Sequence, residues 1–149
     1  MELHDFVLRI GAAAVAGVLI GIEREFKNKH AGLKTNTLVS LGATVFMITS
    51  LEFTGFKDAD LTRVLSQIVV GVGFLGAGVI WKREGEIEGL TTAATIWCSA
   101  AVGCLASLAM YRELLIITAL IIVINLLFGK IDNKIKEEVQ DDWKEKKKE

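Results

Sequence analysis

Hydrophobic and charged residues alternate in long blocks along the chain. Five stretches of roughly 15 to 20 residues carry few or no charged side chains, and short charged links separate them. About 20 apolar residues in a helix, rising 1.5 Å each, cross the roughly 30 Å hydrocarbon core of a bilayer. The pattern predicts an all-α, polytopic membrane helix bundle of about five transmembrane helices. The predicted spans are residues 6–22, 37–51, 61–81, 91–110 and 114–128.

The alternative fold is a soluble helical bundle, which would need a polar stripe along each helix. The fourth and fifth stretches have no such stripe. A hydrophobic content of 52% and a mean hydropathy of +0.45 also favour the membrane. The first stretch differs from a secretory signal, because Glu2 and Asp5 precede it in place of basic residues. We therefore expect it to be retained as a span.

Basic residues are sorted to one side of the predicted spans. With the amino terminus outside, the inner segments hold 13 Lys and Arg residues and the outer side holds four: Arg9, Lys57, Arg63 and Arg112. The positive-inside rule then places the carboxyl terminus in the cytoplasm. We expect residues 1–129 to form a five-span membrane domain. Residues 130–149 are expected to form a charged cytoplasmic tail, as a helical extension or partly disordered.

The tail carries four apolar residues at intervals of four. Residues at this spacing lie along one helical face. The pattern fits an extension of the last span that frays at its end. It also fits a helix that lies on the membrane or docks on a partner. The four residues are Ile131, Ile135, Val139 and Trp143.

Small residues recur at helical spacing in three of the spans. Helices in lipid associate by close packing, because burying apolar surface gains little there. These positions are therefore predicted to mediate tight helix packing, within one chain or between two chains. A homo-oligomer, with a dimer favoured, is expected. The predicted packing residues are Gly17, Gly21, Gly71, Gly73, Gly76, Gly78, Ser99 and Gly103.

Polar residues gather at the predicted cytoplasmic rim. A carboxylate such as Glu23 is disfavoured at a helix carboxyl end, so it needs Arg24, Lys34 or a bound cation as a partner. The hydroxyl groups at the start of the fourth span are expected to cap its free amides. The cluster is either a binding site for a ligand or protein, or an ion-paired bundle with capped ends. Its residues are Glu23, Arg24, Lys34, Thr35, Asn36, Thr91 and Thr92.

Two polar residues lie inside spans, Gln67 in the third and Asn125 in the fifth. Each is expected to form an interhelical hydrogen bond or to line a polar path. Trp97 in the fourth span is a further binding candidate and fits a packing role equally well. Trp81 is predicted to lie in the aromatic belt at the membrane interface.

The sequence gives no support for catalysis or nucleic-acid binding. It contains no nucleophile elbow, paired-His metal motif or phosphate-binding Gly loop. It also has no basic patch with interleaved aromatic residues. A non-enzymatic protein is expected. No cofactor is identified, a divalent cation has no support in the sequence, and any metal site is unknown.

Four motifs together closely resemble the membrane domain of the MgtC/SapB family of bacterial inner-membrane proteins. They are GVLIGIERE at residues 17–25, AGLKTN at 31–36, QIVVGVGFLGAGVI at 67–80 and GLTTAATIWCSAA at 89–101. The resemblance runs from about residue 6 to residue 128. It implies a five-span domain linked to survival in scarce magnesium and, in pathogens, to virulence. The best-known members are described as restraining the F-type ATP synthase, without moving magnesium themselves.

The chain departs from those members in two respects. They carry a soluble ACT-like domain after the last span, where this chain has a short charged tail. They also have Leu-Asn-Thr at residues 90–92 and Arg-Thr-Asn at residues 34–36 of this chain. The resemblance implies regulation by contact with another membrane complex in low Mg²⁺ or host stress. The alternatives are a small ion transporter or channel, and a purely structural bundle that binds no ligand.

Overall fold

The computed structural model describes residues 1–53, 60–83 and 86–146, with side chains placed up to Gly129 except that of Glu86. Within these residues the chain forms five α-helices and one short antiparallel hairpin, which agrees with the predicted all-α bundle. The helices are α1 Leu3–Phe26, α2 Leu33–Glu52, α3 Leu61–Ala77, α4 Leu90–Ser107 and α5 Tyr111–Lys146. The strands are β1 Trp81–Arg83 and β2 Glu86–Glu88.

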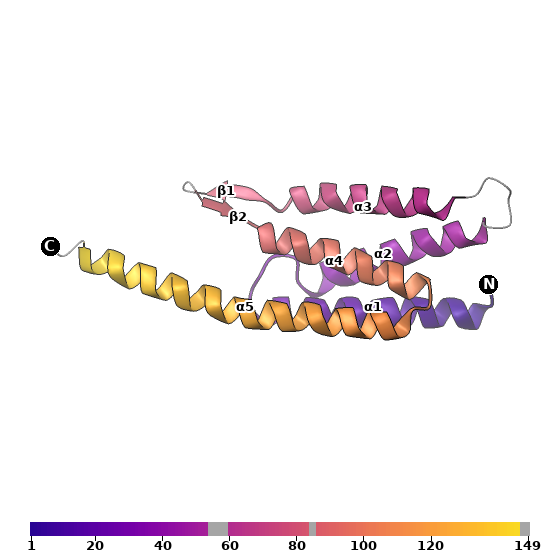
Figure 1. The fold of residues 1–149 in the computed structure, drawn as a ribbon, viewed down its shortest axis with the longest axis horizontal. Helices are drawn as coiled ribbons and strands as arrows, with labels where there is room; N and C mark the ends of the chain where they lie inside the picture. The colour runs from indigo at the N-terminus through magenta and orange to yellow at the C-terminus, as the bar shows by residue number, and fades with distance from the viewer. Residues whose placement is uncertain (54–59, 84–85, 147–149) are drawn as a thin grey trace.

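The helices run alternately up and down the long axis of the molecule (Figure 1). α3 lies along one side and packs against α4 and α2, whereas α1 and α5 lie along the other side. The hairpin joins α3 to α4 at the end of the bundle where α1 stops, and α5 continues past that end. We call this end the Arg24 end, after the last buried residue of α1.

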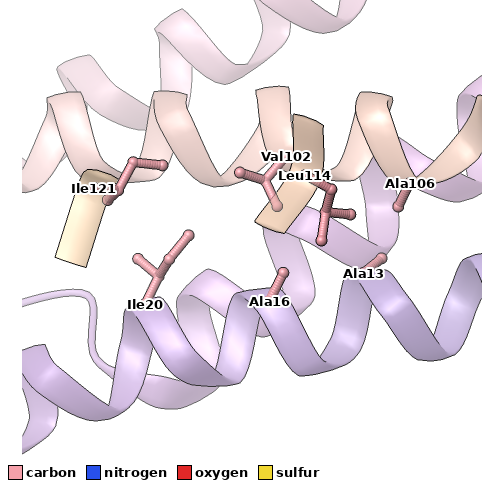
Figure 2. Packing of buried hydrophobic residues seen from close by; sticks show 7 residues of the cluster. All are labelled: Ala13, Ala16, Ile20, Val102, Ala106, Leu114 and Ile121. Atoms are coloured by element: carbon pink, nitrogen blue, oxygen red, sulfur yellow. The ribbon is translucent and has the colours of Figure 1, made fainter. Parts of the chain in front are cut away.

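Two apolar clusters form the core, and α4 contributes to both. One joins small residues of α1 to α4 and α5, as Figure 2 shows for the facing side chains of Ala13, Ala16 and Ile20 with Val102, Ala106, Leu114 and Ile121. The other joins α4 to α2 and α3. Its members are Ala43, Met47, Ile68, Val72, Ile96, Ala100 and Cys104. Because α4 touches every other helix, it is the central element of the bundle.

The outside of the bundle is apolar and much of the inside is polar. Phe74 and Ile116 are 81% and 66% exposed, whereas Asn36, Ser40 and Thr44 of α2 have no exposed surface. This arrangement suits lipid, because backbone and side-chain polar groups must find partners inside the protein there. The chain is a membrane protein.

Three helices in the described part of the chain are long and apolar enough to cross a membrane. They are α1, α4 and the segment Tyr111–Gly129 of α5. α3 has 17 residues and extends about 26 Å at 1.5 Å per residue. α2 does not reach the same apolar character, because it carries the buried hydroxyl and amide groups named above. These polar side chains of α2 face the core. The overall composition of α2 therefore understates how well this helix fits in a membrane beside the more apolar helices.

The third helix ends four residues before the predicted end of its span. Gly76-Ala-Gly78 lowers the helix propensity at this point, and the chain turns into the hairpin. Trp81 consequently lies in β1, where its Nε1 donates to Glu88 Oε2 at 3.1 Å. Its ring packs against that of His30 in a T-shaped arrangement, with a centroid distance of 4.8 Å. The sequence did not predict this hairpin.

Asp60 caps the start of α3. Its carboxylate accepts hydrogen bonds from the Thr62 hydroxyl at 2.6 Å and from the Thr62 backbone N–H at 2.9 Å. These bonds hold the pKa of Asp60 below its usual range. Lys57, which entered the charge count for the outer side, lies outside the described residues. α5 extends helically to Lys146, and the division into membrane domain and tail stays a prediction.

Candidate functional site

Arg24 is a buried cation held by neutral oxygen atoms. It is 3% exposed at the end of α1. Its guanidinium donates to Thr92 Oγ1 at 2.7 Å and to Thr95 Oγ1 at 3.2 Å, both on α4. It also donates to the His30 carbonyl from Nε and Nη2, at 3.2 and 3.0 Å. Hydrogen bonds to charged groups contribute about 1.5–3 kcal/mol each, so this cluster fixes α1, α4 and the loop after α1 together.

Glu23 is paired with Lys27. Glu23 Oε1 lies 2.6 Å from Lys27 Nζ, and the Glu23 side chain is only 8% exposed. Lys27 Nζ also donates to the Asn125 carbonyl of α5 at 3.2 Å. Arg24, Lys34 and a bound cation were the partners proposed from the sequence. Lys27, four positions along the same helix face, is a partner that this set lacks.

Asn36 connects the loop between α1 and α2 to α4. Its Nδ2 donates to the carbonyls of Ala31 and Gly32, and its Oδ1 accepts from Ser99 Oγ at 2.8 Å. The side chain has no exposed surface. Ala31 has a left-handed φ of 55°, which turns its carbonyl toward this amide. Asn36 therefore ties the loop to the bundle.

Glycines let α1 and α2 approach closely. A Cβ atom at Gly17 would lie 2.7 Å from Thr37 Cα, and one at Gly21 would lie 2.5 Å from Leu33 Cα. Neither distance is tolerable, so both positions require glycine. Gly103 of α4 meets the backbone of Ser40 in the same way. These small residues pack within one chain.

Buried hydroxyl groups of α2 bond to the backbone of its neighbours across these contacts. Ser40 Oγ donates to the Ala13 carbonyl at 3.0 Å, and Thr44 Oγ1 donates to the Gly103 carbonyl at 2.9 Å. Such bonds hold helices together where apolar burial cannot.

The start of α4 differs from the sequence expectation. Its N-cap residue is Gly89 with φ of 92°, and no side chain caps the helix. The hydroxyl of Thr92 accepts from Arg24 instead of from a free amide. Gly89 is required here because a Cβ would collide with the Val79 carbonyl. The prediction of a Thr cap is therefore wrong. The start of α4 is determined instead by Gly89, where the chain coming from the hairpin passes close to Val79.

Several predicted residues lie apart from the cluster. Lys34, Thr35 and Thr91 are exposed at the Arg24 end, and Trp97 is 50% exposed on the outside of α4. Gln67 is exposed on α3. Of the remaining packing residues, Gly76 touches Ala93 of α4, whereas Gly71 and Gly73 have open space and Gly78 meets only carbonyls of its own turn.

Sequence reasoning missed Lys27 and Thr95 as polar partners. The i,i+4 spacing of Glu23 and Lys27 was a signal for the first. Thr95 is not among the residues predicted for the rim cluster, although it lies one helical turn after Thr91. The His30 carbonyl gave no signal, because a backbone group carries none.

Two buried polar atoms of α5 lack a partner within the described residues, Thr118 Oγ1 and Asn125 Nδ2. No group of three or more His, Cys, Asp or Glu side chains capable of holding a metal occurs in the part of the chain that the structure describes. The groups at the Arg24 end chiefly bind one another.

The fold and this polar cluster define a small polytopic membrane protein with a polar interior at one end. A model of the MgtC family matches residues 10–134, and the chain belongs to the MgtC family. It is 48% identical over 118 residues to Protein MgtC of Brucella abortus, covering 79% of this chain and 49% of that protein.

It is 42% identical over 135 residues to Protein MgtC of Salmonella typhimurium, covering 91% of this chain and 57% of the relative. An uncharacterized protein of Synechocystis is 44% identical over 126 residues, with 85% and 53% covered. The chain thus spans about half the length of these relatives. No solved structure gives a significant match.

Proposed function

We propose that the chain is a non-enzymatic regulator that acts by contact with another membrane complex. The F-type ATP synthase is the first candidate partner, and adaptation to low Mg²⁺ or host stress is the setting. Both come from the MgtC resemblance. In this proposal the protein resides in the bacterial inner membrane, with its amino terminus outside and the Arg24 end in the cytoplasm. Self-association into a dimer belongs to the same proposal.

One observation favours regulation by contact with another complex over ion transport. Two of the three charged groups predicted for the rim cluster are already satisfied inside the chain, Glu23 by Lys27 and Arg24 by neutral oxygens. An ion path would require these groups to exchange partners with each ion. Their burial and bonding instead suit a rigid structural element that supports an outer surface.

Exposed polar residues at the same end supply a contact surface. Lys34 and Thr35 begin α2 and Thr91 begins α4, and their side chains point away from the buried cluster. The network of Arg24 and Asn36 fixes the helices from which they project. A partner complex would therefore meet a preformed surface, which lowers the cost of ordering on binding.

The test is affinity purification from native membranes followed by mass spectrometry. The wild-type chain is expected to recover a stoichiometric membrane complex, with ATP synthase subunits the first to look for. Lys34→Ala is expected to reduce that recovery. Arg112→Ala is the matched control, because Arg112 is an exposed basic residue that begins α5 at the opposite end. Recovery of lipid and the chain alone would refute the proposal.

A small ion transporter is the second candidate, and one observation favours it. Among the described residues Asn125 Nδ2 is buried without a partner, and the backbone carbonyl of Asn125 accepts from Lys27, the partner of Glu23. Buried polar groups without a partner are rare inside membrane proteins and often mark ion or proton pathways. Flux measurements on reconstituted vesicles separate the two functions.

A further inference from the structure

The hairpin of β1 and β2 has one side against the bundle and one side turned away from it. Trp81 pairs with Glu88 across the hairpin, and Lys82 pairs with Ile87. Residues paired across two strands lie on the same side, and successive residues alternate between the sides. The Trp81 side faces the bundle, because its ring packs against His30 in the loop between α1 and α2. Lys82 and Ile87 therefore share the side that faces away.

We call the side formed by Lys82 and Ile87 the outer side of the hairpin. Both residues are exposed, Ile87 to 62%. Ile80 and Leu90, which precede and follow the hairpin in the chain, are exposed as well. The hairpin continues beyond α3 along the same edge of the molecule (Figure 1). An exposed apolar side chain thus lies beside an exposed cation, a combination that suits the boundary between acyl chains and phosphates.

The length of α3 sets the depth of the hairpin in the membrane. α3 has 17 residues and extends about 26 Å, whereas the hydrocarbon core is about 30 Å thick. The helix starts beside Asp60 and Arg63, whose charges keep this end at or outside the boundary of the core. The other end, at Ala77, therefore lies at least about 4 Å inside the opposite boundary.

The chain then reaches the lipid head groups at the base of the hairpin. The turn after α3 is tight, because the N–H groups of Val79 and Ile80 donate to carbonyls three residues back. At about 2 Å per turn residue and 3.3 Å per strand residue, Lys82 and Ile87 lie at most about 13 Å beyond Ala77. This distance places them at most about 9 Å outside the hydrocarbon core, and helix tilt brings them closer. Because the head-group layer is about 5–8 Å deep, the pair lies at the level of the phosphates.

We propose that the outer side of the hairpin binds anionic phospholipid head groups. The Lys82 ammonium donates to phosphate oxygens, and Ile87 inserts between the head groups toward the acyl chains. Glu88 does not compete for Lys82, because it lies on the other side and accepts from Trp81 Nε1 at 3.1 Å. The register thus leaves the outer side with a positive charge, which complements an anionic lipid surface. This inference goes beyond the proposed function and involves no protein partner.

Spin-label accessibility in reconstituted vesicles tests the outer side. In a Cys98→Ala, Cys104→Ala background, Ile87→Cys carries a nitroxide in vesicles of phosphatidylglycerol and phosphatidylcholine. Collision with oxygen reports lipid around the label, and collision with a neutral nickel chelate, present on both sides of the membrane, reports water. Oxygen is expected to dominate at residue 87. Arg83→Cys is the matched control, because Arg83 is exposed in β1 on the Trp81 side, and the nickel chelate is expected to dominate there.

The role of the charge is tested by lipid composition. When phosphatidylcholine replaces all the phosphatidylglycerol, the preference for oxygen at residue 87 is expected to fall, because Lys82 loses its anionic partners. Lys82→Gln is expected to show the lower preference in both kinds of vesicle. Lys29→Gln is the control, because Lys29 is an exposed lysine at the same end of the bundle. It should behave as the chain with both lysines intact does.

Equal contact with the nickel chelate at residues 87 and 83 would overturn the proposal. Equal contact with lipid at both positions would also overturn it, because the two sides of the hairpin would then be alike. A disulfide-linked dimer of unlabelled Ile87→Cys would assign the outer side to a second copy in place of lipid. If purification recovers no partner complex while residue 87 contacts lipid, the proposed function fails and this inference stands.

Discussion

Arg24 Nη2 donates a hydrogen bond of 2.7 Å to Thr92 Oγ1, joining the last turn of α1 to the first turn of α4. Both side chains are buried, and the acceptor is neutral. A buried guanidinium tolerates this situation only if its N–H groups are bonded in good geometry. The Arg24 cluster is therefore the element that holds the polar end of the bundle together.

Replacing Thr92 by Val keeps the shape of the side chain and removes the acceptor. It leaves one buried guanidinium N–H unpaired, and we expect the free energy of unfolding to fall by about 1–3 kcal/mol. Thr91→Val is the control, because Thr91 is exposed and its hydroxyl does not touch Arg24. Thermal unfolding in detergent checks the difference. Equal stability of the two variants would show that the bond contributes nothing.

Gly21→Ala places a methyl group against the backbone of α2 at Leu33. We expect a loss of about 1–3 kcal/mol, because a backbone contact cannot move aside as a flexible side chain can. Gly42→Ala is the matched change in α2, where a Cβ has open space. It should stabilise the protein by about 0.5–1 kcal/mol through the helix propensity of alanine. Similar effects of the two changes would contradict the close α1–α2 contact.

The Asn36 amide and the Ser99 hydroxyl are predicted to be energetically coupled. Their hydrogen bond of 2.8 Å is buried and links α2 to α4. In a double-mutant cycle of Asn36→Ala and Ser99→Ala, the coupling free energy should be about 0.5–1.5 kcal/mol. The pair Thr35→Ala and Ser99→Ala should be additive, because Thr35 is exposed. A coupling free energy near zero for Asn36 and Ser99 would contradict the hydrogen bond between the two side chains.

The Asp60 cap makes the start of α3 sensitive to acid. Its pKa is lowered in the folded protein by the hydrogen bonds from Thr62. The stabilisation is present above the unfolded-state pKa of about 4 and is lost as pH falls through the lower folded-state value. Asp60→Asn keeps an acceptor at every pH, so its thermal stability should lack this acid-dependent loss. Identical acid profiles of the two proteins would exclude the cap.

The long apolar blocks of the sequence predict the five helices and their membrane environment. They do so because each helix that spans lipid needs a long run of apolar residues. They miss the hairpin Trp81–Glu88, because the third apolar block runs on through Gly78 to Trp81 without a charge to mark the end of α3. They predict α2 but not which way its polar residues point, and these face the core. Helix ends and facing directions depend on tertiary contacts that no single segment encodes.

The candidate site is also only partly predictable, because the direction in which each side chain faces depends on tertiary contacts. Polar residue types at one rim point to Glu23, Arg24, Asn36 and Thr92, and these are buried there. Which of them pair depends on helix rotation. The rotation of each helix about its axis puts Lys34 on the outside and brings Thr95 to Arg24. The sequence could therefore predict residues of the cluster but not which of them form hydrogen bonds with one another.

Ion flux across reconstituted vesicles tests most directly the claim that this bundle acts by contact and conducts no ions. Purified, folded chain is placed in liposomes and assayed for Mg²⁺, Ca²⁺, Na⁺ and H⁺, with an ionophore as the positive control. We predict flux equal to that of protein-free vesicles for every ion. Flux above that level that disappears in Glu23→Gln would contradict the account and assign the Glu23–Lys27 pair to an ion path.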